Sequence, residues 1–362
     1  MFINEKVVMS NILIYGVNGY SGQLVVEEVL KLGLKPVLAG RNKKKVAALT
    51  EKYALEYKAF SLLDADDLVR ELTGFNIVMH CAGPYVDTFA PMVDACIKVG
   101  ADYLDLSGEM MVFEEAAARS SEFKTAGIMV MPGVAFDIVP SDSLAVYLKN
   151  KLPDATELGL YFNLFHNDIK CIGRGSNTTF IRYIGKGNLV RINGEIVSKT
   201  AGFDGGRFDI DGKKIRMVGL PWGDVSTAYH STGIGNIKTF MDLPELSILT
   251  MKMSNIFPSF WQSSPVQKLL AKVVTLLPES PDKEARSKKS CSILGEVRNE
   301  AGDTVRAILE TTEVYNFTGI SAAAILKAVA NGRREPGHQT PGRLLGPDFV
   351  LDIAGTKRRD LD

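Results

Sequence analysis

The chain has 362 residues, 46% hydrophobic and 23% charged, as expected of a soluble globular protein with room for two domains that each have a core. The formal net charge is zero, which excludes a general electrostatic affinity for nucleic acid. The four cysteines show no C-x-x-C spacing and no apolar run is long enough to span a membrane, so no disulfide framework, zinc site or transmembrane segment is predicted. The first ten residues are too charged for a signal peptide, and we expect a cytoplasmic protein.

The predicted elements begin with a strand, a glycine loop and a helix. The apolar run 11–15 is expected to be a central strand that is buried on both faces. Glycines follow at a G-x-x-G-x-x-G spacing, and the apolar residues behind them have the period of an amphipathic helix. A second strand over 37–39 completes a βαβ unit of the kind that binds dinucleotides. The alternative interpretation of the glycines is an ordinary turn.

Each glycine of this loop has its own expected role. Gly16 allows the sharp turn after the strand, Gly19 lets the backbone approach a pyrophosphate, and Gly22 brings the helix close to the sheet. The N–H groups at the helix start would face the phosphates, with Ser21 as a further donor. The residues predicted to bind this part of a cofactor are Gly16, Asn18, Gly19, Tyr20, Ser21 and Gly22.

The residues after the second strand distinguish between the two nicotinamide cofactors. An NAD site would have Asp or Glu here to bind the ribose 2′-hydroxyl, whereas this chain has Gly40-Arg41-Asn42 and then three lysines. A guanidinium can bind a 2′-phosphate through two hydrogen bonds. Basic residues at a helix start oppose the helix dipole, which favours an anion nearby over a solvated basic turn. We therefore predict NADP(H), bound by Arg41 and Asn42.

Strands and helices continue to alternate up to residue 150, which predicts a Rossmann-type doubly wound parallel sheet. A helix over 43–53, a strand over 57–60 and a helix over 64–72 precede a fourth strand over 75–81. The helix over 64–72 opens on Asp64, which we also assign to the cofactor site.

The fourth strand should lie beside the first, at the point where strand order reverses and ligands bind. The residues at its end are therefore expected near the nicotinamide: Cys81, Ala82, Gly83, Pro84 and Tyr85. The alternative is a Gly-Pro turn before a helix over 91–99. A fifth strand over 102–106, a helix over 112–124 and a sixth strand over 128–131 follow. The loop 133–137 then lies at the carboxyl end of a strand, where it can face a substrate.

Five segments occur in order along the chain: GVNGYSG, LAGRN, HCAGPY, ADYLDLSGE and PGVAFDIVPSD. In this order and spacing they resemble the saccharopine dehydrogenase-like oxidoreductases, a family that includes saccharopine reductases and trans-acting enoyl reductases. The enoyl reductase branch typically has G-F-D-S-I-P-S-D where this chain has residues 135–142, and residues 221–235 are similar to a second segment of that branch. The family often has a Gly-Gly-Thr motif where this chain has 173–179.

Beyond residue 150 the apolar residues alternate more clearly, as at 156–165 and 188–197, and 295–313 has the pattern of a hairpin. We therefore predict a second, α+β domain built on a mostly antiparallel sheet. The predicted domains are residues 1–150 for NADP binding, 151–312 for substrate binding and dimerisation, and 313–362 as a C-terminal segment. The family resemblance implies that this last segment, with a helix over 321–330, returns to the Rossmann domain.

Hydride transfer from a nicotinamide usually needs a proton donor or acceptor as well. The candidate catalytic residues are Tyr85, Asp137 and His230, and Arg174 and Asp224 are weighed beside them. Each has a structural alternative: Tyr85 could be a packing ring, Asp137 a turn or cap residue, His230 a satisfied strand histidine and Arg174 a surface charge. No Tyr-x-x-x-Lys pair occurs in a position suited to short-chain dehydrogenase chemistry.

The helix predicted over 264–277 has one apolar face, and the preceding residues 248–261 are rich in Met, Ile, Phe and Trp. Packing in the core or at a dimer interface is the commoner cause of such a stripe. A helix that contacts a membrane surface, or a lipid-facing groove, is the alternative.

The sequence supports two hypotheses about function. The first is an NADP(H)-dependent oxidoreductase, a homodimer that acts on a C=C or C=N bond of a small hydrophobic substrate. A di-acid such as saccharopine would instead require several convergent arginines. The second is a sensor or scaffold that binds NADP(H) with little catalysis, at a membrane surface.

Overall fold

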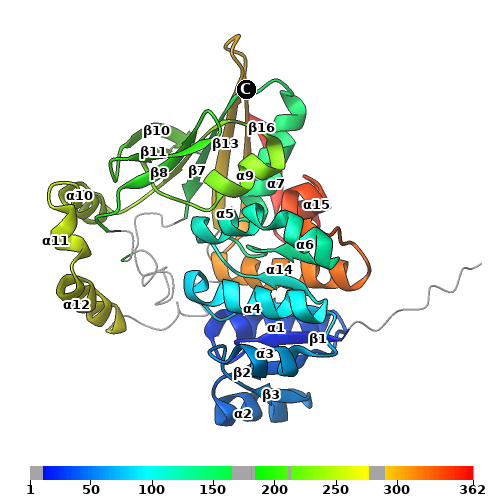
Figure 1. The fold of residues 1–362 in the computed structure, drawn as a ribbon. Coiled ribbons are helices and arrows are strands. Elements are labelled where there is room, and N and C mark those ends of the chain that lie inside the picture. Colours follow the sequence, from blue (N-terminus) through cyan, green and yellow to red (C-terminus); the bar gives the residue numbers. More distant parts are fainter. Residues whose placement is uncertain (1–10, 165–180, 182–183, 211–212, 277–289, 362) are drawn as a thin grey trace, which may run out of the picture. The chain divides into compact units, whose positions relative to one another are not determined.

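A computed structural model describes residues 11–164, 181, 184–210, 213–276 and 290–361 (Figure 1). The segment 173–179 with its candidate Arg174 lies outside the described residues. The chain forms two compact units: Met1–Val139 with Tyr315–Gly346, and Pro140–Val314 with Pro347–Asp362. No helix in the described ranges combines the length and the apolar character that crossing a membrane requires.

A parallel sheet of seven strands is the centre of the first unit, in the order β15-β6-β5-β4-β1-β2-β3. The strands are β1 (Ile12–Tyr15), β2 (Val37–Gly40), β3 (Tyr57–Ala59), β4 (Ile77–His80), β5 (Asp102–Asp105), β6 (Met129–Met131) and β15 (Gly337–His338). β1 pairs in parallel with both β2 and β4. Strand order therefore reverses between β1 and β4, and the predicted Rossmann-type sheet is confirmed.

The helices from α1 to α6 connect successive strands of this sheet, as a doubly wound sheet requires, and α14 and α15 flank β15. They are α1 (Tyr20–Lys31), α2 (Lys43–Tyr53), α3 (Ala65–Leu72), α4 (Tyr85–Val99), α5 (Met110–Ala118), α6 (Ser120–Ala126), α14 (Val314–Ala330) and α15 (Pro341–Leu345). In α1 the buried residues are Gly22, Val25, Val26 and Val29, whose spacing places them on one face. All four residues of β1 and of β4 are buried, which explains their apolar sequences.

Two predicted helix boundaries in this unit are wrong. The helix expected over 91–99 begins earlier, at Tyr85, and contains Pro91 in its interior. Its start is set by a tertiary contact, because the Glu109 carboxylate accepts a hydrogen bond from the backbone N–H of Val86 at 2.7 Å. The helix expected over 112–124 is divided into α5 and α6 at Arg119, whose guanidinium pairs with Asp94 at 2.6 Å.

The second unit is built on a nine-stranded sheet in which β10-β11-β12-β7-β13-β14-β16 form the main path and β8 and β9 extend from β12. Its strands are β7 (Glu157–Asn163), β8 (Asn188–Ile192), β9 (Glu195–Lys199), β10 (Asp204–Ile210), β11 (Lys213–Gly219), β12 (Asn236–Met241), β13 (Ser290–Arg298), β14 (Thr304–Thr312) and β16 (Lys357–Leu361). Among the described strand pairs of this second sheet only β7–β12 is parallel, so the predicted mostly antiparallel sheet is confirmed.

The helices of the second unit are α7 (Val139–Lys151), α9 (Asp224–Thr232), α10 (Glu245–Ser254), α11 (Pro258–Gln262) and α12 (Ser264–Thr275), with a 3₁₀ turn η2 (Phe349–Asp352). Tyr161 and Phe240 stack in the core of the sheet with ring centroids 4.8 Å apart. The division differs from the predicted one in two places. Nearly all of α7 belongs to the second unit, and β16 pairs with β14, so residues 347–362 do not remain with the Rossmann unit.

Candidate functional site

The glycine loop brings β1, β4 and α1 into close contact. Gly16 has φ +90°, and a Cβ added there would lie 2.7 Å from the carbonyl carbon of Cys81 at the end of β4. A Cβ on Gly22 would lie 2.5 Å from the carbonyl oxygen of Gly16. Both positions therefore require glycine, and the close packing expected of Gly22 is against the loop itself. Around Gly19 the nearest atom to an added Cβ is the same oxygen, at 3.3 Å.

The start of α1 differs from the starts of the next three helices. The Asn42 side chain caps α2 by accepting from the N–H of Lys45 at 3.1 Å, and Asp64 caps α3 by accepting from two N–H groups. Glu109 accepts from the first turn of α4. By contrast α1 has Gly19 as its N-cap, no side-chain cap and no acidic residue in its first turn. The positive end of its dipole is thus left available to an anion.

A second positive feature follows β2. Arg41 is exposed and forms no ion pair with any residue that the structure describes. The first turn of α2 consists of lysines and contains no acidic residue. The neighbouring Asn18 bridges the two loops, since its Oδ1 would lie 2.7 Å from a Cβ on Gly40. Arg41 and the start of α1 thus belong to adjacent strand ends, because β1 and β2 are paired.

The residues at the end of β4 divide into surface and interior groups. Gly83 is exposed, Ala82 and Pro84 are partly buried, and Cys81 and Tyr85 are buried. The Tyr85 hydroxyl donates to the backbone oxygen of His80 at 3.4 Å, and burial raises the pKa of this phenol well above 10. Tyr85 therefore has the features of the packing ring that was the alternative to a catalytic role.

Asp137 lies in the loop after β6 and is only partly buried. Its Oδ2 would be 2.6 Å from a Cβ on Gly108, so the carboxyl packs directly on the residue before Glu109. Burial, and then the charge of Glu109, raise the pKa of Asp137 from 3.8 to about 6. A carboxyl with this pKa can both take and give a proton near neutral pH.

A buried polar chain that the sequence analysis missed connects β4 and β5. His80 Nδ1 lies 3.0 Å from the Tyr103 hydroxyl, which donates to Asp105 Oδ2 at 2.7 Å. Asp105 Oδ1 also accepts from the backbone N–H groups of Ser107 and Gly133, at 2.8 and 2.9 Å. Burial raises the pKa of Asp105 to about 7 and lowers that of His80 to about 3. The signal that could have identified this chain in the sequence is the presence of polar residues inside the otherwise apolar strands β4 and β5.

The remaining candidates belong to the second unit. His230 lies in the last turn of α9, a helix, so the strand expected as its structural alternative is wrong. Asp224 is fully buried in the first turn of the same helix. Tyr85 and Asp137 belong to the first unit, in which Glu109 contacts the backbone of Tyr85 and raises the pKa of Asp137.

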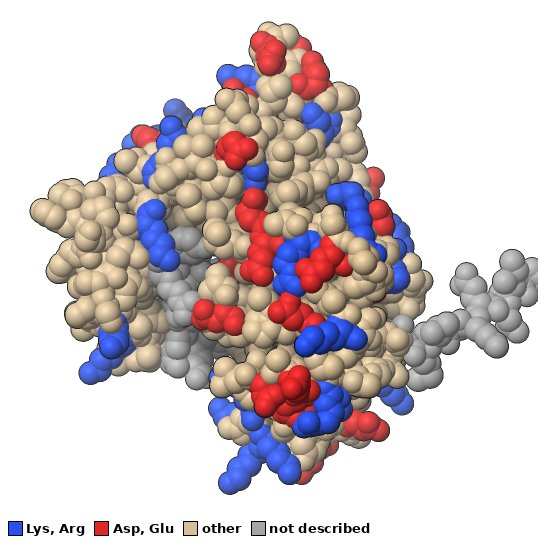
Figure 2. Space-filling model, viewed as in Figure 1, with Lys and Arg blue, Asp and Glu red and all other residues tan. Residues whose placement is uncertain are grey.

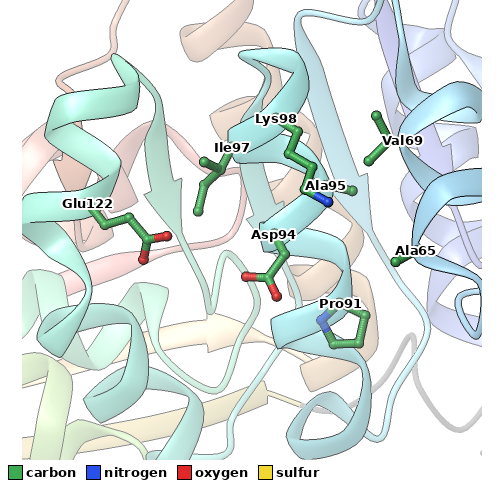
Figure 3. A pocket seen from close by; sticks show the side chains of 8 residues that line it. All are labelled: Ala65, Val69, Pro91, Asp94, Ala95, Ile97, Lys98 and Glu122. Atoms are coloured by element: carbon green, nitrogen blue, oxygen red, sulfur yellow. The ribbon is translucent and has the colours of Figure 1, made fainter.

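A separate pocket lies among α3, α4 and α6 (Figure 3). Its lining consists of Ala65, Val69, Pro91, Asp94, Ala95, Ile97, Lys98 and Glu122. None of the predicted site residues is among them. The strand-end loops, rather than this pocket, are therefore the candidate cofactor site.

The comparisons with known proteins agree with this geometry. Residues 12–131 match the family described as saccharopine dehydrogenase NADP binding domain. The human saccharopine dehydrogenase-like oxidoreductase is 28% identical over 166 residues, and the match covers 39% of this chain and 38% of that protein. A Mycobacterium tuberculosis protein whose name assigns it to the trans-acting enoyl reductases is 31% identical over 145 residues, covering 38% of this chain and 34% of its own. Each alignment thus spans well under half of the relative.

The fold of the whole chain is similar to that of a solved enzyme. The apo saccharopine dehydrogenase (L-Glu forming) of Saccharomyces cerevisiae superposes with a TM-score of 0.65, covering 98% of this chain and 100% of that one at 13% sequence identity. The NADP-binding description of the matched family confirms the predicted cofactor. The resemblance inferred from the motifs is likewise confirmed: residues 12–131 match the saccharopine dehydrogenase NADP binding domain.

Proposed function

We propose that this chain is an NADP(H)-dependent oxidoreductase that transfers a hydride to or from a C=C or C=N bond of a small hydrophobic substrate. The main support is the uncapped start of α1 behind the Gly16 turn, in a segment of an NADP-binding family. When bound, the nicotinamide supplies or accepts the hydride, and the protein positions it and controls the proton.

The chain's own residues have distinct tasks in this proposal. The backbone N–H groups at the start of α1 bind the pyrophosphate, and the Arg41 guanidinium binds the 2′-phosphate. The residues 81–84 at the end of β4 lie beside the nicotinamide, because ligands of such sheets bind where strand order reverses. Asp137 gives or takes the proton, since its pKa is about 6 and Tyr85 is held in the interior.

The proposed substrate is hydrophobic rather than di-acidic. Several arginines of the second unit are already engaged by protein acceptors. Arg191 donates to the backbone oxygens of Val225 and Gly194, and Arg216 and Arg306 pair with Glu245 and Glu296. Such residues would have to leave these partners to bind two substrate carboxylates, at a cost in desolvation.

The cofactor assignment is tested with Arg41→Ala and the control Arg207→Ala, which also removes an exposed arginine. NADPH and NADH are titrated into the purified full chain by isothermal calorimetry. We expect Arg41→Ala to weaken NADPH at least about tenfold and NADH by less than about twofold, because only NADPH carries the 2′-phosphate. Equal losses for both cofactors, or no NADPH binding by the wild-type protein at micromolar concentrations, would contradict the assignment.

The catalytic assignment is tested separately, with an α,β-unsaturated acyl thioester and a cyclic imine as probe substrates. We expect NADPH oxidation with one of them, and a loss of about 10²-fold or more in kcat for Asp137→Asn with NADPH affinity retained. Tight NADP(H) binding without turnover of either probe would favour the sensor or scaffold function instead. We also propose a cytoplasmic homodimer, which sedimentation of the purified protein and cell fractionation would test.

A further inference from the structure

The helices α10, α11 and α12 follow one another in the second unit (Figure 1). They expose an unusual number of large apolar side chains. The outward residues of this segment are Leu246, Leu249, Met253, Ile256, Phe257, Phe260, Leu269, Val273 and Leu276, each between 50% and 82% exposed. In α10 they recur at intervals of three and four, and so do those of α12 and the residue after it. Each helix therefore has one continuous apolar face in solvent.

The opposite side of these helices is attached to the second unit. Ile248 and Met251 of α10 are buried, and the Asn255 side chain exchanges two hydrogen bonds with the backbone of Ala201, at 2.9 and 3.0 Å. The Gln262 side chain donates to the backbone oxygen of Ile184. In α12 only Val274 is buried. The exposed residues of the α12 stripe, Leu269, Val273 and Leu276, are thus not part of the core, which was one of the two commoner explanations.

The charge of the segment is mostly positive. Between residues 245 and 276 the chain has three lysines, Lys252, Lys268 and Lys272, and one acidic residue, Glu245, which pairs with Arg216 at 3.2 Å. All three are exposed, and none forms an ion pair with another residue in the described part of the chain. In Figure 2 this part of the surface, at the left, is mostly tan with isolated blue side chains. A surface that is both apolar and predominantly basic is complementary to anionic lipid headgroups above acyl chains.

We propose that α10–α12 form a docking surface for an anionic lipid membrane, with the apolar faces inserted at the boundary between headgroups and acyl chains. Phe257 lies just before α11 and Phe260 lies within it, between the two longer helices. Both side chains would lie at this boundary. The lysines would contact lipid phosphates. A second copy of the chain would fit this surface less well, because two such faces would bring their lysines together, and the acidic residue of these helices, Glu245, already pairs with Arg216. The surface would deliver the enzyme to substrates dissolved in the membrane.

The experiment measures co-sedimentation of the full-length protein with vesicles. Wild-type protein is compared on phosphatidylcholine vesicles with and without about 30% phosphatidylserine, at about 0.1 M and about 0.5 M salt. One variant replaces Phe257, Leu269 and Val273 by Asp, and another replaces the three lysines by Glu. The control variant is Leu63→Asp, at a residue of the first unit that is 96% exposed.

We expect wild-type binding to the anionic vesicles to exceed binding to the neutral ones at least about tenfold and to weaken with salt. Both α10–α12 variants should lose about tenfold or more in partitioning, while Leu63→Asp behaves as wild type. Circular dichroism and NADPH titration of each variant verify folding, and unchanged NADPH affinity separates this surface from the cofactor site. The proposal would be overturned if the wild-type protein bound neither kind of vesicle. It would also be overturned, in favour of a dimer interface, if the variants changed the sedimentation coefficient without affecting vesicle binding.

Discussion

Glu109 shows how one carboxylate can organise the edge of a sheet. It accepts a hydrogen bond from the first turn of α4, and its charge contributes to the raised pKa of Asp137. The same side chain therefore fixes the position of the helix after β4 and the protonation of the loop after β6. The sequence placed Glu109 at a strand end but gave no indication of these contacts, which join residues 23 and 28 positions apart.

The raised pKa of Asp137 makes stability depend on pH in a predictable direction. Between about pH 4 and pH 6 the folded protein binds more protons at this site than the unfolded chain, so the free energy of unfolding falls as pH rises. We expect wild-type protein to lose up to about 3 kcal/mol more than Asp137→Asn between about pH 4 and pH 7. Urea denaturation of both proteins across this range is the measurement. A wild-type loss no larger than that of the variant would contradict a partly buried Asp137 whose pKa is raised to about 6.

The Tyr103 hydroxyl connects His80 and Asp105 in the interior of the same unit. Tyr103→Phe removes this connection and leaves both partners buried with one hydrogen bond fewer. We expect a loss of about 1–3 kcal/mol in the free energy of unfolding. Tyr57→Phe is the matched control, because Tyr57 is 39% exposed. If urea denaturation gave the two variants equal free energies of unfolding, the buried hydrogen bonds of Tyr103 would not contribute to stability.

At the level of elements, the starts of the helices show what the sequence can predict. Strand β1, the glycine loop and α1 were all predicted, because a doubly buried strand and an amphipathic helix have opposite apolar patterns and the loop lies between them. The helix α4 was predicted six residues too late, since a proline usually lies near a helix start. A distant Glu109 moves that start to Tyr85, and such a tertiary contact has no local signal.

The packing of α1 on its own loop leads to a prediction about Gly22. Alanine has the better helix propensity by about 1 kcal/mol, so Gly22→Ala would be stabilising if space were available. Its Cβ would instead lie 2.5 Å from the Gly16 oxygen, and the loop would have to move. We expect a lower melting temperature and NADPH affinity reduced at least about tenfold. Gly235→Ala is the control, because its Cβ would meet the nearest atom at an ordinary 3.4 Å; a similar effect of both changes would contradict the packing argument.

At the scale of the whole molecule, the chain leaves the first unit after Val139 and returns to it at Tyr315. The returning helix α14 is tied to the loop after β6: Thr318 accepts from the N–H of Phe136 at 3.2 Å, and Ser321 donates to the backbone oxygen of Val134 at 3.1 Å. That this helix returns to the Rossmann unit was predicted from the family resemblance alone, because small residues on a helix do not indicate which element packs against them. The sequence also did not determine what the apolar faces of α10–α12 contact, since apolar periodicity is the same for a core, an interface or a membrane surface.

The loop after α14 is attached to β5 by an ion pair between Arg334 and Asp102. We expect this ion pair to stabilise the attachment of α14 to the first unit. Arg334 makes two hydrogen bonds to Asp102, at 2.5 and 2.7 Å, and Asp102 is only 4% exposed. Arg334→Ala leaves that carboxylate buried, with the backbone N–H of Met129 as its remaining hydrogen-bond donor among the described residues. We therefore expect urea denaturation to show a loss of about 3 kcal/mol in the free energy of unfolding. The exposed neighbour Arg333 provides the control, and its replacement by Ala should cost less than about 0.5 kcal/mol. Asp102→Asn should lower the free energy of unfolding much less in the Arg334→Ala variant than in the wild-type protein. In that variant the buried carboxylate has already lost its partner. Additive losses would mean that the two residues stabilise the unit independently.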